Sequence, residues 1–104
     1  MSRYKVITLC GSTKFKDDFM EQQKRLTLEG NIVISVGVFG HSGDSEALSE
    51  KTKKMLDDIH REKIDMSDEI FVINKNGYIG DSTKSEIEYA KSHGISVKYM
   101  ETNL

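Results

Sequence analysis

The sequence predicts a single α/β domain over residues 1–104, a Rossmann- or flavodoxin-like three-layer sandwich with a four-stranded parallel sheet. Three observations predict this fold class. The 104 residues are enough for one compact domain. Four short apolar clusters alternate with three amphipathic segments, which is the βαβ pattern of parallel sheets. Residues 70–73 are apolar at every position, as expected of a strand buried on both faces.

Strands are expected where β-branched and aromatic residues cluster between Gly, Asn or Asp, at residues 4–9, 32–36, 70–73 and 95–99. Helices are expected where apolar residues recur at helical spacing, at about residues 13–28, 48–66 and 83–93. Because crossovers between parallel strands are right-handed, the favoured strand order is 2-1-3-4, with the first helix on one face of the sheet and the other two on the opposite face. Strands 3 and 4 are then partly uncovered, and we expect a homodimer or higher homo-oligomer that buries this face.

The composition excludes several classes of function. Lys and Arg number 15 and Asp and Glu 17, for a net charge of −2, so generic nucleic-acid binding is not expected. No stretch approaches the ~20 apolar residues that cross a bilayer, so no membrane partner is expected. Cys10 is the only cysteine, which excludes an internal disulfide and fits a reducing compartment. These features favour a cytoplasmic protein.

In a sheet of this order, ligands bind beyond the carboxyl ends of the strands, here between strands 1 and 3. Three loops rich in Gly, Ser and Asp arrive there, at residues 10–14, 39–44 and 74–82. In the first loop the main-chain N–H groups at a helix start, with Lys14, can hold an anion. The alternative is a Ser or Thr helix cap after a tight turn. A phosphatase loop with Cys10 as nucleophile is disfavoured, because Lys16 stands where bidentate phosphate binding needs Arg.

Glu86 is the most informative acidic residue. It is expected in the first turn of the third helix, where the helix dipole favours an ionised carboxylate that points toward the same crevice. Such a carboxylate is what a nucleophile at a sugar anomeric carbon requires. The alternative is a capping box over residues 83–86, in which Glu86 accepts a hydrogen bond from the Thr83 N–H.

On the second helix, Leu56, His60 and Ile64 share one stripe, so His60 is expected to point inward. Such a histidine is either a hydrogen-bonded core residue or, near the crevice, a group that holds or protonates a ligand. His41 and His93 make no metal-ligand spacing with another His or Cys, so neither a metal site nor a cofactor is predicted.

Taken together, these segments resemble the nucleoside 2-deoxyribosyltransferase superfamily, which includes the 2'-deoxynucleoside 5'-phosphate N-hydrolases. The resemblance rests on the CGS motif at residues 10–12, the SDEIFV segment at residues 67–72, a Gly/Ser/Asp loop and the EIEYA helix start at residues 86–90. It covers nearly the whole chain and is strongest from about residue 59 to residue 99. Its most specific part is the Glu-aliphatic-X-aromatic-Ala pattern.

The resemblance implies cleavage or transfer at the N-glycosidic bond of a (deoxy)nucleoside or its 5'-monophosphate, with water or a second base as acceptor. The family's nucleophile falls on Glu86. The sequence departs from the family at His60, which stands where a catalytic aspartate is usual, and at Gly80, where Asp or Ser is commoner. We therefore expect His60, or else Asp81, to supply or relay the proton that the departing base needs. The residues expected to bind sugar or phosphate are Gly11, Ser12, Thr13, Lys14, Asn74, Gly80, Asp81 and Ser82.

Two further interpretations stay open. A non-catalytic module that binds a nucleotide or phosphosugar would keep the crevice without the chemistry, and His60 in place of the aspartate favours it. A protein-interaction scaffold would bind no nucleotide at all. If the protein binds a nucleotide, as an enzyme or as a module, Tyr78 or Phe39 can stack on the base, although aromatic residues in loops are as often packed locally.

Overall fold

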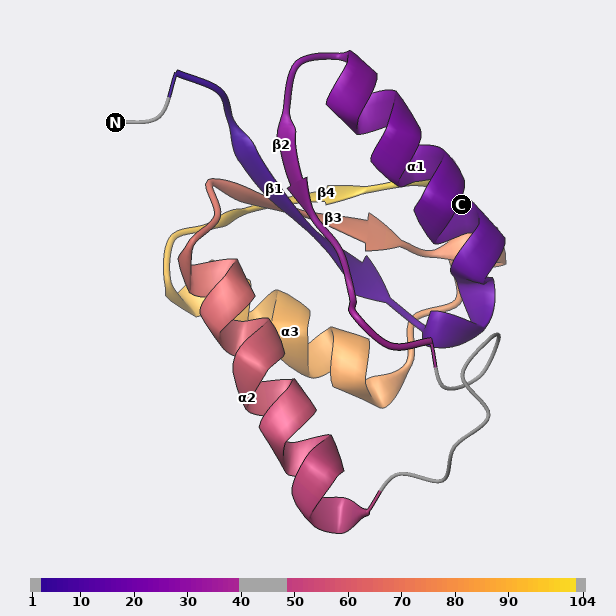
Figure 1. Cartoon of the computed structure of the whole chain (residues 1–104), viewed down its shortest axis with the longest axis vertical. Helices are drawn as coiled ribbons and strands as arrows, with labels where there is room; N and C mark the ends of the chain where they lie inside the picture. The colour runs from indigo at the N-terminus through magenta and orange to yellow at the C-terminus, as the bar shows by residue number, and fades with distance from the viewer. Residues whose placement is uncertain (1–2, 40–48, 103–104) are drawn as a thin grey trace.

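The computed structural model describes residues 3–39 and 49–102. It is an α/β fold with a four-stranded, wholly parallel sheet in the order β2-β1-β3-β4, which confirms the predicted order (Figure 1). The elements in chain order are β1 (Val6–Gly11), η1 (Thr13–Phe15), α1 (Lys16–Leu28), β2 (Ile32–Ile34), α2 (Glu50–Asp65), β3 (Glu69–Ile73), η2 (Lys75–Gly77), α3 (Asp81–Ser92) and β4 (Ser96–Tyr99).

The helices cover both faces of the sheet, α1 on one face and α2 and α3 on the other (Figure 1). Side chains alternate along β1, so Ile7 and Leu9 pack in the cluster with α1, whereas Cys10 packs in the cluster with α2 and α3. Thr8 and Cys10 are both completely buried. The inner face of β1 on the side of α2 and α3 therefore carries two groups that can form polar contacts.

Gly11 ends β1 at the point where the chain passes close to β3. Its φ is +149°, and a Cβ at this position would lie 2.8 Å from the main-chain oxygen of Ile73. Only glycine fits here without a shift of the main chain. The chain can then turn directly from the carboxyl end of β1 into η1, beside the end of β3.

The third helix begins earlier than predicted. Gly80 is its N-cap, in an extended conformation, and the Gly80 carbonyl accepts a hydrogen bond from the Lys84 N–H. Glu86 is therefore the sixth helical residue and lies in the second turn. The expected first-turn position is wrong, and so is the capping box, because Thr83 lies inside the helix. The early start has no side-chain cap that the sequence could have signalled.

The reason given for an oligomer is also wrong. Every residue of β3 is buried within this chain, and Phe71 and Ile73 pack in the cluster with α1. In β4, the positions paired with the α1 side of β3 carry the exposed polar residues Ser96 and Lys98. The uncovered part of β3 and β4 is thus polar, and an oligomer stays a prediction without this support. Among the helices of the described residues, none combines the length and apolar character that crossing a membrane requires.

Candidate active site

A cavity of about 510 Å³ opens beyond the carboxyl ends of β1 and β3. It is lined by the turn after β1 (residues 11–13), the segment after β2 (residues 36–38), the inner side of α2, and Tyr78 with the start of α3 (residues 80–83). Its size suits a small organic ligand. The cavity therefore lies at the switch point that the strand order predicts.

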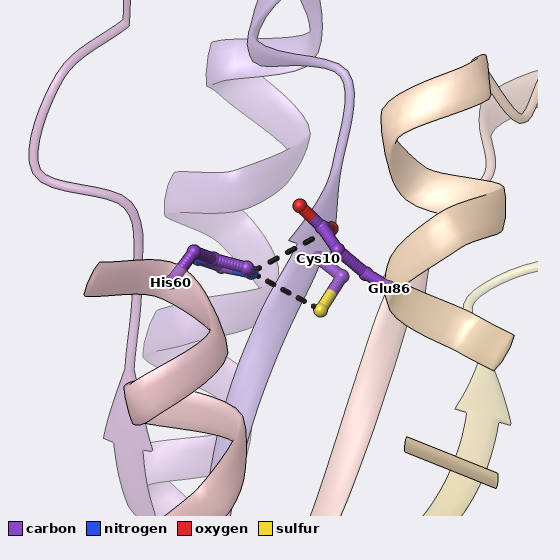
Figure 2. Close-up of side chains that lie close together, drawn as sticks. All are labelled: Cys10, His60 and Glu86. Atoms are coloured by element: carbon purple, nitrogen blue, oxygen red, sulfur yellow. Dashed lines mark hydrogen bonds and ion pairs between the residues drawn. The ribbon is translucent and has the colours of Figure 1, made fainter. Parts of the chain in front are cut away.

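His60 from α2 and Glu86 from α3 both line this cavity and lie in contact with each other. His60 is on the buried stripe of α2 with Ile64, as predicted, and is 8% exposed. The Glu86 side chain is 17% exposed, and its Oε1 lies 3.6 Å from His60 Nε2 (Figure 2). The Glu86 carboxylate thus faces His60 and the cavity, and it does not fold back to cap the start of α3.

Cys10 completes a three-residue cluster with His60 and Glu86. Its Sγ lies 3.3 Å from His60 Nε2. Figure 2 shows the three side chains converging from β1, α2 and α3. One sulfur, one nitrogen and one carboxylate oxygen lie within 4.8 Å of one another, and all three belong to residue types that bind metals.

Burial shifts the pKa of every member of this cluster toward its uncharged form. It raises the pKa of Glu86 to about 7, with a smaller contribution in the same direction from Asp57, against the hydrogen bond with Cys10 and the charge of Arg61. Burial lowers the pKa of His60 to about 4, helped by Lys63. Burial also raises the pKa of the Cys10 thiol, and Glu86 adds to this rise. The cluster is therefore mostly neutral between about pH 4 and pH 7.

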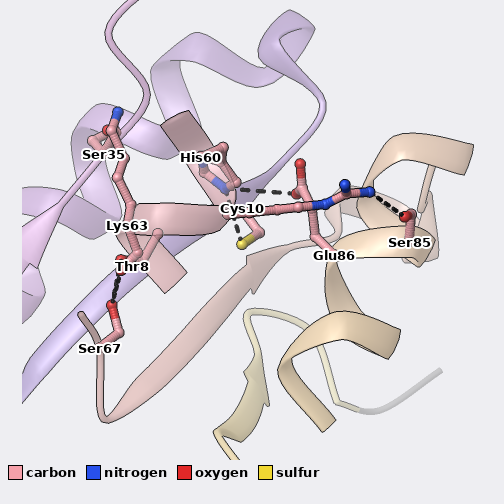
Figure 3. A network of polar contacts seen from close by, with 9 residues as sticks. Thr8, Cys10, Ser35, His60, Lys63, Ser67, Ser85 and Glu86 are labelled. Atoms are coloured by element: carbon pink, nitrogen blue, oxygen red, sulfur yellow. Dashed lines mark hydrogen bonds and ion pairs between the residues drawn. The ribbon is translucent and has the colours of Figure 1, made fainter. Parts of the chain in front are cut away.

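A second polar cluster fixes the end of α2. Thr8 Oγ1 contacts Ser67 Oγ, and both hydroxyls donate to the Lys63 carbonyl, at 3.2 and 2.8 Å (Figure 3). The Lys63 Nζ donates to the Ser35 carbonyl at 2.9 Å, on the segment that leads from β2 to the cavity. These bonds tie α2 to β1 one turn beyond His60.

The structure brings most of the predicted ligand-binding residues together and leaves two aside. Six of them line the cavity: Gly11, Ser12, Thr13, Gly80, Asp81 and Ser82. Lys14 is not among the lining residues, and its Nζ lies 3.6 Å from the centre of the Tyr78 ring. Asn74 is buried, and its amide both donates to and accepts from the Glu101 main chain, at 3.0 and 2.8 Å.

The aromatic candidates differ in the same way. Tyr78 lines the cavity and is 46% exposed, and its ring also contacts Lys14 and Phe15. Phe39 is buried against Phe19, with ring centres 5.5 Å apart, and belongs to the core. The remainder of the predicted loop at residues 39–44, with His41, lies outside the described residues.

Several residues of the site were missed from the sequence. Asp57 and Lys63 line the cavity, each about one turn along α2 from His60. The three-residue spacing from His60 could have pointed to both. The contact of Cys10 with His60 joins residues 50 positions apart, and no local pattern signals it.

Comparison of the chain with models of known protein families finds no match, and comparison with curated protein sequences finds none. The resemblance to the nucleoside 2-deoxyribosyltransferase superfamily stays a prediction.

Proposed function

We propose that this protein cleaves the N-glycosidic bond of a (deoxy)nucleoside or its 5'-monophosphate, with Glu86 as the nucleophile. One observation carries the proposal: a mostly buried carboxylate faces a ligand-sized cavity at the switch point of the sheet. The same carboxylate is the residue on which the family's nucleophile would fall. A small-molecule nucleoside or nucleotide is thus the proposed ligand.

The chemistry begins with ionisation of Glu86. Because the pKa of Glu86 is about 7 and that of His60 is about 4, the Glu86 proton passes to solvent and not to His60 Nε2, which lies 3.6 Å from the carboxylate. Glu86 then attacks the anomeric carbon through an oxocarbenium-like transition state, and the C–N bond to the base breaks. The base leaves with a proton that His60 relays or Asp81 supplies. Water then releases the sugar, which makes the protein a hydrolase, or a second base accepts it, which makes the protein a transferase.

The start of α3 and the turn after β1 suit a sugar hydroxyl or a 5'-phosphate. The first N–H groups of α3 have no partner within the helix, and residues 80–83 line the cavity. Gly11, Ser12 and Thr13 line the cavity at the end of β1. A buried, reduced Cys10 beside Glu86 fits a cytoplasmic setting, which we propose for this protein.

The test is release of free base from deoxynucleosides and deoxynucleoside monophosphates, followed by chromatography. Wild-type protein should release base, and Glu86→Gln should reduce the rate by at least about 10³-fold, as expected when a nucleophile is removed. Glu88→Gln is the matched control, because Glu88 is exposed on the same helix. Equal rates in wild type and Glu86→Gln would contradict the proposal.

The second candidate is a binding module for the same ligands. The lowered pKa of His60 favours it, because a histidine with a pKa of about 4 is a poor proton donor at neutral pH. A module would show a higher melting temperature with a nucleotide and no base release from any substrate.

A further inference from the structure

The geometry points to a metal site: Cys10, His60 and Glu86 together bind one divalent transition-metal ion of the zinc type. The ligands are the Cys10 thiolate, His60 Nε2 and a Glu86 carboxylate oxygen. A sulfur, a nitrogen and an oxygen ligand are all common on zinc, and three protein ligands leave a fourth position open. That position faces the cavity, because His60 and Glu86 both line it.

Two of the three distances between the ligand atoms fall in the range of a tetrahedral site. Zinc bonds of ~2.0–2.3 Å at tetrahedral angles place neighbouring ligand atoms about 3.3–3.6 Å apart. The structure has 3.3 Å between Cys10 Sγ and His60 Nε2, and 3.6 Å between His60 Nε2 and Glu86 Oε1. All three atoms already lie within 4.8 Å of one another. An ion can therefore bind with only small side-chain movements.

The charges also balance. A thiolate and a carboxylate neutralise a divalent cation, and the imidazole binds in its neutral form. The Cys10 proton passes to solvent as the sulfur–metal bond forms, as does the Glu86 proton where the carboxyl is protonated, and nothing is oxidised or reduced. A buried site without net charge avoids most of the cost of placing an ion inside the protein. The neutral cluster exchanges its protons for the metal.

The ligands are held rigidly by different elements. Cys10 is fixed in β1, the central strand with β3, and is completely buried. His60 and Glu86 come from α2 and α3, and the bonds of Thr8 and Ser67 to Lys63 hold α2 against β1. A thiolate and an imidazole favour zinc, cobalt and nickel over magnesium and calcium, which prefer oxygen ligands.

Metal binding has a consequence that rests on the proposed function. The carboxylate that would attack the sugar is the same group that ligates the metal. An occupied site should therefore be inactive in base release, and a chelator should restore the activity. Binding itself does not depend on whether the protein has glycosidic activity.

The test is titration of metal-free protein with Co²⁺, whose spectrum reports its ligands. Wild-type protein should bind one equivalent, with a thiolate-to-cobalt charge-transfer band and the intense visible bands of a tetrahedral ion. Cys10→Ser should lose the charge-transfer band. His60→Ala and Glu86→Gln should each weaken binding by at least about 10-fold. Mutating a residue that only hydrogen-bonds a metal ligand already weakens binding by about this factor, and a ligand itself should matter no less. Zn²⁺ should displace Co²⁺, and an excess of Mg²⁺ should not.

His93→Ala is the matched control and should bind as wild type does, because His93 lies at the end of α3 outside the cluster. Absence of the charge-transfer band in wild type, or binding that is unchanged in His60→Ala and Glu86→Gln, would overturn the metal site. Circular dichroism checks that each variant is folded. If Cys10→Ser does not fold, His60→Ala and Glu86→Gln still test the metal site. Base release by the chelator-treated protein tests the proposed function separately.

Discussion

Thr8 and Cys10 are two residues apart on β1, point to the same side and are both completely buried, yet they take part in different kinds of polar cluster. Around Thr8, two hydroxyls converge on the Lys63 carbonyl, and no group needs to ionise. Around Cys10, three titratable groups converge, and burial shifts the pKa of each. Burial alone therefore does not distinguish structural from functional polar residues. The distinction lies in whether the groups satisfy one another without a change of charge.

The largest expected effect concerns stability as a function of pH. The folded state lowers the pKa of His60 from 6.5 to about 4, so its contribution makes stability rise with pH across that range. It raises the pKa of Glu86 from 4.5 to about 7, so that contribution makes stability fall as pH rises. In the wild type the two slopes oppose each other.

Glu86→Gln should expose the His60 slope, a gain of about 3 kcal/mol in the free energy of unfolding from pH 4 to pH 6.5. His60→Asn should show the opposite slope between pH 4.5 and pH 7. Denaturant unfolding at several pH values measures both. Identical pH profiles in wild type and both variants would mean that the cluster around Cys10 is no more sensitive to charge than the cluster around Thr8.

The rate of base release should depend on pH in a direction set by Glu86. Because the nucleophile must be ionised and its pKa is about 7, kcat/KM should rise with pH, by about 10²-fold between pH 5 and pH 8. Thr8→Val, which leaves the Cys10 cluster intact, should keep the same profile. A rate that falls as pH rises through 7 would show that the protonated form of Glu86 is the active one.

The smallest effect is expected at Thr8. Thr8→Val removes the hydroxyl that contacts Ser67 and Lys63, and should lower the free energy of unfolding by about 1–2 kcal/mol, measured in urea. Base release per folded molecule should change by less than about twofold, because Thr8 has no direct contact with Cys10, His60 or Glu86 and its loss should affect stability alone. A large loss of activity at unchanged stability would instead join the two clusters into one functional unit.

Much of the fold could be predicted because its signals are local. The apolar run at residues 70–73 indicates a strand covered on both faces, and the βαβ alternation with right-handed crossovers leaves few strand orders. The inward direction of His60 follows from its spacing to Leu56 and Ile64. An apolar face on strands 3 and 4 was predicted wrongly, because the edge strand β4 is polar on that side, as the alternation of Ser96 and Lys98 already indicated.

The candidate site was predictable only in part. Glu86 and His60 were identified singly, but their contact with Cys10 depends on how β1, α2 and α3 pack, and no short-range pattern encodes it. The start of α3 was missed because its N-cap is Gly80, which has no side chain to cap the helix and so leaves no signal in the sequence. Lys14 carries a charge suited to phosphate, yet its Nζ lies over Tyr78, which only the packed structure reveals.

The most direct test of the central claim is a crystal structure of Glu86→Gln with an uncleaved deoxynucleoside monophosphate. The variant preserves the shape of the site and removes the nucleophile. The account predicts the sugar in the cavity between α2 and α3, with the amide oxygen of the substituted side chain about 3–3.5 Å from the anomeric carbon. A nucleotide bound elsewhere, or one whose anomeric carbon points away from this side chain, would contradict it.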